Sequence, residues 1–476
     1  MPGSSFFASV GALTASRVLL VFSQIAILPV IARFLTAADF GAFALAMSIV
    51  IFSQILSDAG LGRSLIRQPE VDETEWSSVF WLLTAVGAGL TALLLVTAPL
   101  WVRVFDMPTL GPLVSALAVV PFLAALAAMP NARLERDGRF PTLALIRTAG
   151  ALLGLGLAVV LAMRGAGAWA LVGQQLTLAL CLLVGALRYS TFRPQRTFSA
   201  QGLRQHIVFA RDTIGTSLLF TAQSQAPLML IGYVLGAAPL GLFEMARRLL
   251  NFPQMGLTGP ASQVIYVRMT RALPDLSEVG AIYVATIRLF ALALIPPMVL
   301  LAAAGEVLFP AILSERWAAV AGIFLLATAG FTLEAVASAG GTVFQAAGRT
   351  TLRLRMQTER AILRILAIAI AVSFGIEAVA LTISLFALLY LPRYWQFVHR
   401  VARFDRAAAA STLLVTTGLS LLGAGLLLYA ETRLAPGPWA FLAFSGLALA
   451  ATWGACAGVQ IRSLRQSIAA LGAGFR

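Results

Sequence analysis

The residues of this chain best suited to binding an anion are three charged side chains inside one apolar stretch. Glu244, Arg247 and Arg248 lie within a run that is otherwise long and apolar enough to span a bilayer. In a helix, Glu244 is one turn from both arginines, at the i,i+3 and i,i+4 positions. The carboxylate neutralises one guanidinium, so the second is left for another negative group. This surplus predicts an anion-binding site.

Other charged residues also fall inside apolar stretches and extend this predicted site. A charge at the middle of a bilayer costs at least about 2.5 kcal/mol, so such a side chain normally faces a cavity or an opposite charge. Arg17 and Arg288 each lie well inside a predicted span, and we place them with Glu244, Arg247 and Arg248 in the substrate-binding set. The residues assigned to a gate or to ion coupling are Arg33, Asp39 and Glu334.

We interpret Arg147 and Arg364 differently, as long side chains that extend along their helices to the lipid headgroups. Both residues lie near an end of their predicted spans, and we assign them to the headgroup region. The same alternative stays open for Arg288.

Prolines inside the spans mark the points where helices are expected to bend. Each proline removes a backbone hydrogen bond and bends or breaks its helix, although membrane helices tolerate proline. Pro29 and the adjacent Pro296 and Pro297 are the predicted hinges.

The sequence has no pattern typical of a catalytic or metal centre. It contains no Walker A loop, zinc-ligand spacing or nucleophile elbow. The largest predicted outer loop, residues 99–109, carries Arg103 and Asp106 as its charged residues. Cys181 and Cys456 lie in apolar runs and are expected to be small buried side chains. We therefore expect no catalytic residues, no metal and no cofactor.

The composition identifies the elements that must position these side chains. Of 476 residues, 59% are hydrophobic and 11% are charged, which leaves too little polar surface for a soluble protein of this size. Continuous apolar runs exclude a transmembrane barrel, whose strands alternate. We predict an all-α, polytopic membrane protein with about 14 transmembrane helices. The predicted spans are 10–32, 40–61, 77–98, 109–130, 141–163, 167–187, 212–235, 240–266, 281–305, 318–344, 359–376, 378–398, 408–429 and 437–460.

The distribution of arginine predicts the orientation in the membrane. The chain has a net charge of +14, and arginine supplies all of its positive side chains. The loops after odd-numbered spans carry few of them, namely Arg33, Arg103, Arg164, Arg316 and Arg433. The other loop arginines follow even-numbered spans, and cytoplasmic loops are the basic ones. Both termini are therefore predicted to be cytoplasmic, and no nucleic acid is expected as a partner.

A short segment occurs twice in the chain. Residues 30–49 and 230–249 align without a gap and agree at seven of 20 positions. The shared residues are Ile31/Ile231, Leu35/Leu235, Ala37/Ala237, Ala38/Ala238, Gly41/Gly241, Phe43/Phe243 and Ala46/Ala246. Each copy contains the end of one apolar run, a short break and the start of the next run. The repeat predicts a duplicated helical hairpin.

The duplication extends over the first twelve predicted spans. The loops at Gly138–Phe140 and Gly348–Thr350 each follow an even-numbered span, so spans 1–6 repeat as spans 7–12. Because six is even, the copies have the same orientation and form two parallel six-helix bundles around a central cleft. The predicted parts are an N-terminal bundle at 1–189, a cytoplasmic linker at 190–211, a C-terminal bundle at 212–400, and two accessory helices with the tail at 401–476.

Several motifs together resemble the Wzx-type polysaccharide flippases of the multidrug/oligosaccharidyl-lipid/polysaccharide exporter superfamily. In the first half they are SRVL at Ser16–Leu19, IARFLTAADFGAFALA at Ile31–Ala46 and LSDAGLGRSLIRQ at Leu56–Gln68. In the second half they are LIGYVLGAAPLGLFEMARRL at Leu230–Leu249 and IPPMVLLAAAGEVLFPAILSERWAAV at Ile295–Val320. This chain departs from the family early in the seventh span, where many relatives carry an acidic residue and it has Gln225 and Pro227.

The resemblance implies that an undecaprenyl-diphosphate-linked oligosaccharide is moved between the leaflets of the bacterial cytoplasmic (inner) membrane by alternating access. The family's arginine-lined cavity would correspond to Arg17, Arg247 and Arg288. The expected partners are this lipid-linked substrate and membrane lipids, with a polysaccharide polymerase and the export machinery as further candidates. The alternatives are a multidrug or small-molecule exporter of the same superfamily, a membrane enzyme of polysaccharide assembly, and a non-transporting scaffold.

Overall fold

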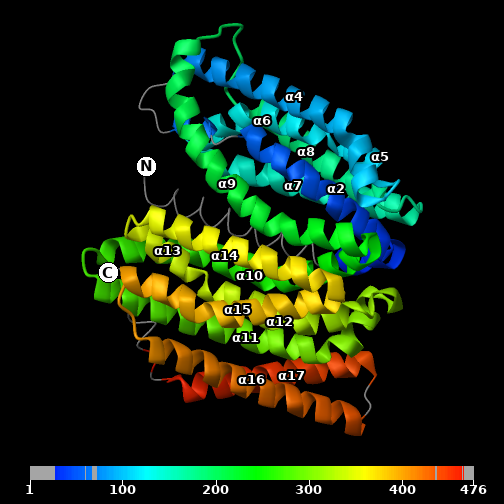
Figure 1. Cartoon of the computed structure of the whole chain (residues 1–476), viewed down its shortest axis with the longest axis vertical. Helices are drawn as coiled ribbons and strands as arrows, with labels where there is room; N and C mark the ends of the chain where they lie inside the picture. The colour runs from blue at the N-terminus through cyan, green and yellow to red at the C-terminus, as the bar shows by residue number, and fades with distance from the viewer. Residues whose placement is uncertain are drawn as a thin grey trace. The chain divides into compact units, whose positions relative to one another are not determined.

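The computed structural model describes residues 27–58, 61–66, 72–434, 437–461, 463 and 465, and most of them are helical (Figure 1). None of these described residues forms a β-strand, and the predicted all-α class is confirmed. The chain divides into two compact units, one ending at Glu244 and the other beginning at Met245. This boundary lies inside a helix, and the predicted division into two bundles, a linker and accessory helices stays a prediction.

The described part of the first unit contains a helical segment at residues 27–34, eight further helices and the start of another. The eight further helices are α2 (Ala37–Asp58), α3 (Leu61–Ile66), α4 (Glu73–Phe105), α5 (Leu110–Leu117), α6 (Val119–Arg136), α7 (Phe140–Met163), α8 (Trp169–Tyr189) and α9 (Ala200–Leu235), followed by α10 (Ala237–Ala272), which crosses the boundary.

The second unit contains the rest of α10 and the remaining helices. They are α11 (Leu276–Leu313), α12 (Val320–Ala337), α13 (Ala339–Ala346), α14 (Thr350–Ala371), α15 (Ile376–Val401), α16 (Arg406–Leu434) and α17 (Pro438–Val459). Short 3₁₀ turns at Glu315–Trp317 and Val372–Phe374 precede α12 and α15.

In the described part of the chain, eleven helical segments are long and apolar enough to cross a membrane. The protein is therefore a multi-pass membrane protein, as predicted. Of the other predicted spans, 10–32 lies mostly outside the described residues, while 240–266 and 359–376 fall on α10 and α14. Both of these helices contain several arginines, which lowers their apolar character. The total of 14 spans stays a prediction.

The loop at residues 190–199 is fixed to α4 in the first unit. Phe192 is buried beside Trp76, with their ring centroids 6.0 Å apart. The indole N–H of Trp81 donates to the carbonyl oxygen of Gln195 at 2.8 Å. Since α9 already begins at Ala200, the second part of the predicted linker is helical.

The two copies of the repeated hairpin pack against each other within the first unit. An added Cβ at Gly41 would clash with the backbone oxygen of Ala237, and an added Cβ at Gly241 would clash with that of Ala37. Glycine permits two helix backbones to approach this closely because it has no Cβ. The two contacts are reciprocal between equivalent residues, which is the pattern of a two-fold axis and supports the predicted duplication.

The long helix α11 lies at the centre of the second unit and packs against α12, α16 and α17. Asp275 caps its N-terminus by accepting hydrogen bonds from the backbone N–H groups of Ser277 and Glu278. The hydrogen bonds from the hydroxyl and backbone N–H of Ser277, together with that from Glu278, hold the pKa of Asp275 below its usual range.

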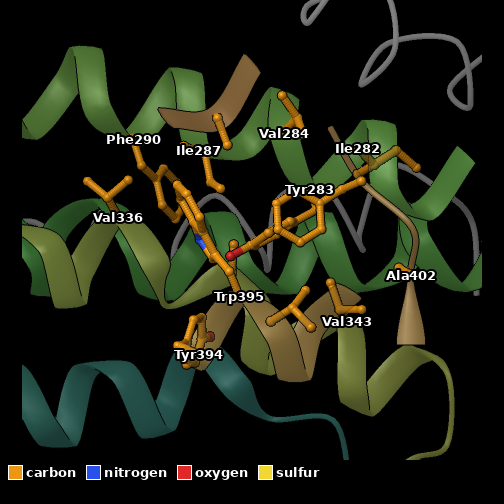
Figure 2. Close-up of a cluster of buried hydrophobic side chains, with 14 of the residues drawn as sticks. Ile282, Tyr283, Val284, Ile287, Phe290, Val336, Val343, Tyr394, Trp395 and Ala402 are labelled. Carbon is orange, nitrogen blue, oxygen red and sulfur yellow. The ribbon is translucent and has the colours of Figure 1, made fainter. Parts of the chain in front are cut away.

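Side chains from α11, α12, α13 and α15 form a buried core in the second unit. Figure 2 shows Tyr283, Phe290 and Trp395 of this core pointing toward one another. The predicted hinges Pro296 and Pro297 lie inside α11, which stays helical across them. Pro29 also lies in a helical segment. A hinge role for these prolines stays a prediction.

Candidate substrate-binding site

Three of the predicted substrate-binding arginines lie on two helices, α10 and α11. The fourth, Arg17, lies outside the described residues. Glu244 is buried on α10, and Arg247 and Arg248 are half-buried one turn further along. Arg288 is half-buried on α11. Each of the four described residues has an interaction partner. Their assignment to substrate binding stays a prediction.

Asp39, one of the predicted gate or coupling residues, caps a helix and fixes a loop. Its Oδ2 accepts hydrogen bonds from the backbone N–H and the hydroxyl of Thr36, at 2.9 and 2.7 Å. The Thr36 hydroxyl in turn accepts from the N–H of Asp39, which completes a capping box at the start of α2. Its Oδ1 accepts from the N–H of Ala168, at 3.1 Å, in the loop before α8. Arg33, which precedes α2, is exposed.

Gln225 joins α9 to α2 in the first unit. Its side-chain oxygen accepts a hydrogen bond from the Ser48 hydroxyl at 2.9 Å, between α9 and α2. Both side chains are buried. A neutral amide therefore provides a helix contact at this position.

Glu334 lies at the centre of a charged cluster in the second unit. Its Oε1 lies 2.6 Å from Nη2 of Arg360 and 2.8 Å from Nη1 of Arg364. α12 supplies the glutamate and α14 supplies the two arginines, one helical turn apart. We call these three residues the Glu334 cluster. One carboxylate faces two guanidiniums, so the cluster has a surplus of positive charge.

The predicted headgroup position of Arg364 is wrong. Its side chain is 12% exposed and paired with Glu334, because α12 brings that carboxylate within its reach. Arg147 fits its predicted position better, with a side chain that is 57% exposed and a single long contact of 3.8 Å to Glu135. The i,i+4 spacing of Arg360 and Arg364 was the signal in the sequence that could have identified them as a pair.

Two tyrosines of α15 lie beside the Glu334 cluster. The Tyr394 hydroxyl donates to the carbonyl oxygen of Ala337 at 2.8 Å, and the Tyr390 hydroxyl donates to that of Met356 at 3.3 Å. Together with Ser338, Glu334 and Arg360 they line a cavity of about 40 Å³, which in this conformation has room for water.

A much larger, apolar cavity lies next to this small one. It has a volume of about 870 Å³, and its walls come from α11, α12, α15 and α16. Among its described lining residues, Glu306 is the one ionisable group. Leu333 and Leu391 line both cavities, so the apolar cavity and the Glu334 cluster share a wall. The helix α16, predicted to be accessory, forms one side of the apolar cavity.

Comparison with known proteins identifies the family. The sequence profile of the family described as polysaccharide biosynthesis protein matches residues 30–322. Teichuronic acid biosynthesis protein TuaB of Bacillus subtilis is 25% identical over 63% of this chain and 63% of its own length. Lipopolysaccharide biosynthesis protein WzxC of Escherichia coli is 21% identical over 72% of this chain and 70% of its own length. The matched region thus spans about three fifths of TuaB.

Solved structures with the same fold are more distant in sequence. The lipid II flippase MurJ superposes with a TM-score of 0.78 at 13% identity, covering 96% of this chain and 99% of its own. A multidrug resistance MATE family transporter of the MOP superfamily superposes with a TM-score of 0.61 at 17% identity, covering 82% and 98%. The resemblance predicted from the motifs is confirmed, and this chain belongs to the polysaccharide biosynthesis protein family.

Proposed function

We propose that this chain moves an undecaprenyl-diphosphate-linked oligosaccharide from the inner to the outer leaflet of the cytoplasmic membrane by alternating access. One relative is named a succinoglycan biosynthesis transport protein and another a lipopolysaccharide biosynthesis protein. The structure that covers nearly the whole chain is that of a lipid II flippase. These names support a role in carrying a lipid-linked glycan across the bilayer.

The observation that carries this proposal is the wall shared by the apolar cavity and the Glu334 cluster. A polyprenyl diphosphate has a long apolar tail joined to an anionic head. An apolar cavity of about 870 Å³ accommodates part of such a tail. Arginine binds phosphate oxygens through paired hydrogen bonds and keeps its charge when partly buried. Leu333 and Leu391 line both environments.

The chemistry of the substrate explains why a protein is needed. The sugar hydroxyls would lose their hydrogen bonds to water in hydrocarbon, at a cost of several kcal/mol for each group without a partner. An inside-negative potential favours outward movement of an anionic head by about 2.3 kcal/mol per charge for each 100 mV crossed. A polar route through the protein removes the cost of desolvating the sugar hydroxyls. The membrane potential can then favour outward movement of the anionic head.

The surplus positive charge of the Glu334 cluster disfavours the alternative of a drug exporter for cations. A cation site needs acidic groups or exposed aromatic faces. Here the two guanidiniums of Arg360 and Arg364 outnumber the one carboxylate beside them. The relatives with transport or flippase names also favour a transporter over an enzyme of polysaccharide assembly.

The test is a deletion strain of the native host, complemented with variants of the full chain. We expect lipid-linked oligosaccharide to accumulate on the cytoplasmic leaflet of the deletion strain. The wild-type gene should clear it, and the double variant Arg360→Ala/Arg364→Ala should not. Arg355→Ala is the matched control, because Arg355 is exposed on the same helix. Normal surface glycan in the deletion strain would rule out the proposed function.

A further inference from the structure

We propose that a second, polar cavity, inside the first unit, binds sugar units of the substrate; this inference rests on the proposed function. The cavity has a volume of about 420 Å³. Three membrane-spanning helices each contribute one carboxamide to its wall, namely Gln54 from α2, Asn131 from α6 and Gln175 from α8. Glu135 and Arg147 complete its polar lining.

The three carboxamides have no partner within the part of the protein that the structure describes. The side-chain amides of Gln54, Asn131 and Gln175 make no hydrogen bond to another described residue. Within a bilayer, a polar side chain normally faces a protein partner or a cavity that holds polar molecules. Three such groups from three helices converge on one cavity, so the cavity is suited to a polar occupant with several hydrogen-bonding groups.

The charge of the cavity favours a neutral occupant. Arg147 Nη2 lies 3.8 Å from Glu135 Oε1, so the one cation among the described lining residues faces the one anion. This differs from the Glu334 cluster, where two guanidiniums face one carboxylate. A diphosphate is therefore poorly matched by this cavity, and a neutral polyhydroxyl group is well matched.

Sugars fit both the hydrogen-bonding pattern and the size of this cavity. Each carboxamide offers donors on its nitrogen and an acceptor on its oxygen, so one side chain can pair with two neighbouring hydroxyls. The rest of the lining is small or apolar, with Ala124, Ala127 and Ala128 leaving room between the helices. A volume of about 420 Å³ lies within the range of small-ligand sites.

The position of the cavity suits a sugar that arrives from the cytoplasm. Gln54 and Asn131 lie about one turn before the ends of α2 and α6, which the arginine distribution predicts to be cytoplasmic ends. Gln175 lies deeper, in the outer half of α8. The carboxamides therefore form a path from the predicted cytoplasmic side toward the middle of the membrane.

The test compares diphosphate probes with and without a sugar, bound to the full-length protein in lipid nanodiscs. The probes are geranyl diphosphate and its conjugates with glucose, galactose and N-acetylglucosamine. The test variant is Gln54→Met/Asn131→Leu/Gln175→Met, in which each amide is replaced by an apolar group of similar shape. We expect the wild type to bind at least one sugar conjugate about tenfold more tightly than geranyl diphosphate. The triple variant should lose this gain and keep its affinity for geranyl diphosphate.

The matched control is Gln174→Met, at the neighbouring position of α8 and outside the cavity lining. This control variant should keep the full increase in affinity that the sugar provides over geranyl diphosphate. The three single variants should each lose part of the gain, which keeps the test decisive if the triple variant does not fold. A sugar-dependent gain that survives in the triple variant, or equal binding of all four probes by the wild type, would overturn the sugar site. Failure of the wild type to bind any diphosphate probe would instead argue against the proposed function.

Discussion

Glu334 gives the clearest example of how one residue decides the charge of its surroundings. Its side chain is 22% exposed, and its carboxylate lies within 2.8 Å of guanidiniums from two turns of α14. Removing one partner of such a group leaves a partly buried charge without compensation, which costs more than the pair contributes. The cluster therefore links α12 to α14 through ion pairs while it keeps one positive charge in excess.

The variant Glu334→Gln keeps the shape of the side chain and removes the negative charge. It leaves Arg360 and Arg364 repelling each other, so we expect the free energy of unfolding to fall by about 1–3 kcal/mol. Partial exposure of the carboxylate places the expected loss below that of a fully buried pair. The measurement is the thermal unfolding of the purified protein in detergent. Glu306→Gln, at an exposed glutamate outside the cluster, is the control and should unfold like the wild type.

Arg17 and Arg248 carry the anion-binding prediction made from the sequence. Arg17→Ala and Arg248→Ala should each abolish glycan export in the complemented deletion strain, while the amount of protein in the membrane stays normal. Arg→Lys at either position should restore export only in part, since lysine binds phosphate as a point charge. Full export by both alanine variants would exclude these two residues from the substrate route.

Element packing in the first unit depends on the contact between α2 and the start of α10. Gly41→Ala and Gly241→Ala should each push the two backbones apart, since the added methyl group meets a carbonyl oxygen. We expect a loss of about 1–3 kcal/mol in the free energy of unfolding for either variant. Gly156→Ala on α7 is the matched control, because its added Cβ meets no atom within 4 Å outside its own stretch of helix. This control should leave the free energy of unfolding unchanged or slightly raised. An equal loss in the control would show that the effect is not specific to the contact between α2 and α10.

The sequence predicted the helices well because each one is a long apolar run with polar or glycine-containing breaks. It did not predict how the helices pair. Arg364 was placed at the headgroups because it lies near an end of its predicted span. Its partner Glu334 lies on another helix, 30 residues away in the chain, and the sequence does not show that they meet. The carboxamides of Gln54, Asn131 and Gln175 were missed because they are uncharged. Their position inside spans was a signal, but their convergence depends on how α2, α6 and α8 pack.

For the whole molecule, the distribution of arginine predicts which loops face the cytoplasm. Cys181 and Cys456 should first be replaced by alanine to remove the native thiols. Thr109→Cys, in an outer loop, should then react with a membrane-impermeant maleimide in intact cells. Gln345→Cys should react only after the inner membrane is opened. Both positions are exposed, so a difference in labelling reports their side of the membrane. Reaction of Gln345→Cys in intact cells would reverse the predicted topology.

The reciprocal contact of Gly41 with Ala237 and of Gly241 with Ala37 also bears on the ancestry of the chain. Contacts of this kind join identical subunits in a homodimer. Two separate molecules that each carried one copy of the duplicated spans would be able to make the same reciprocal contact. After fusion, each half is free to change except where it touches its counterpart. A bulkier residue at position 41 would therefore require a compensating change near position 237, and these pairs of positions should co-evolve among relatives.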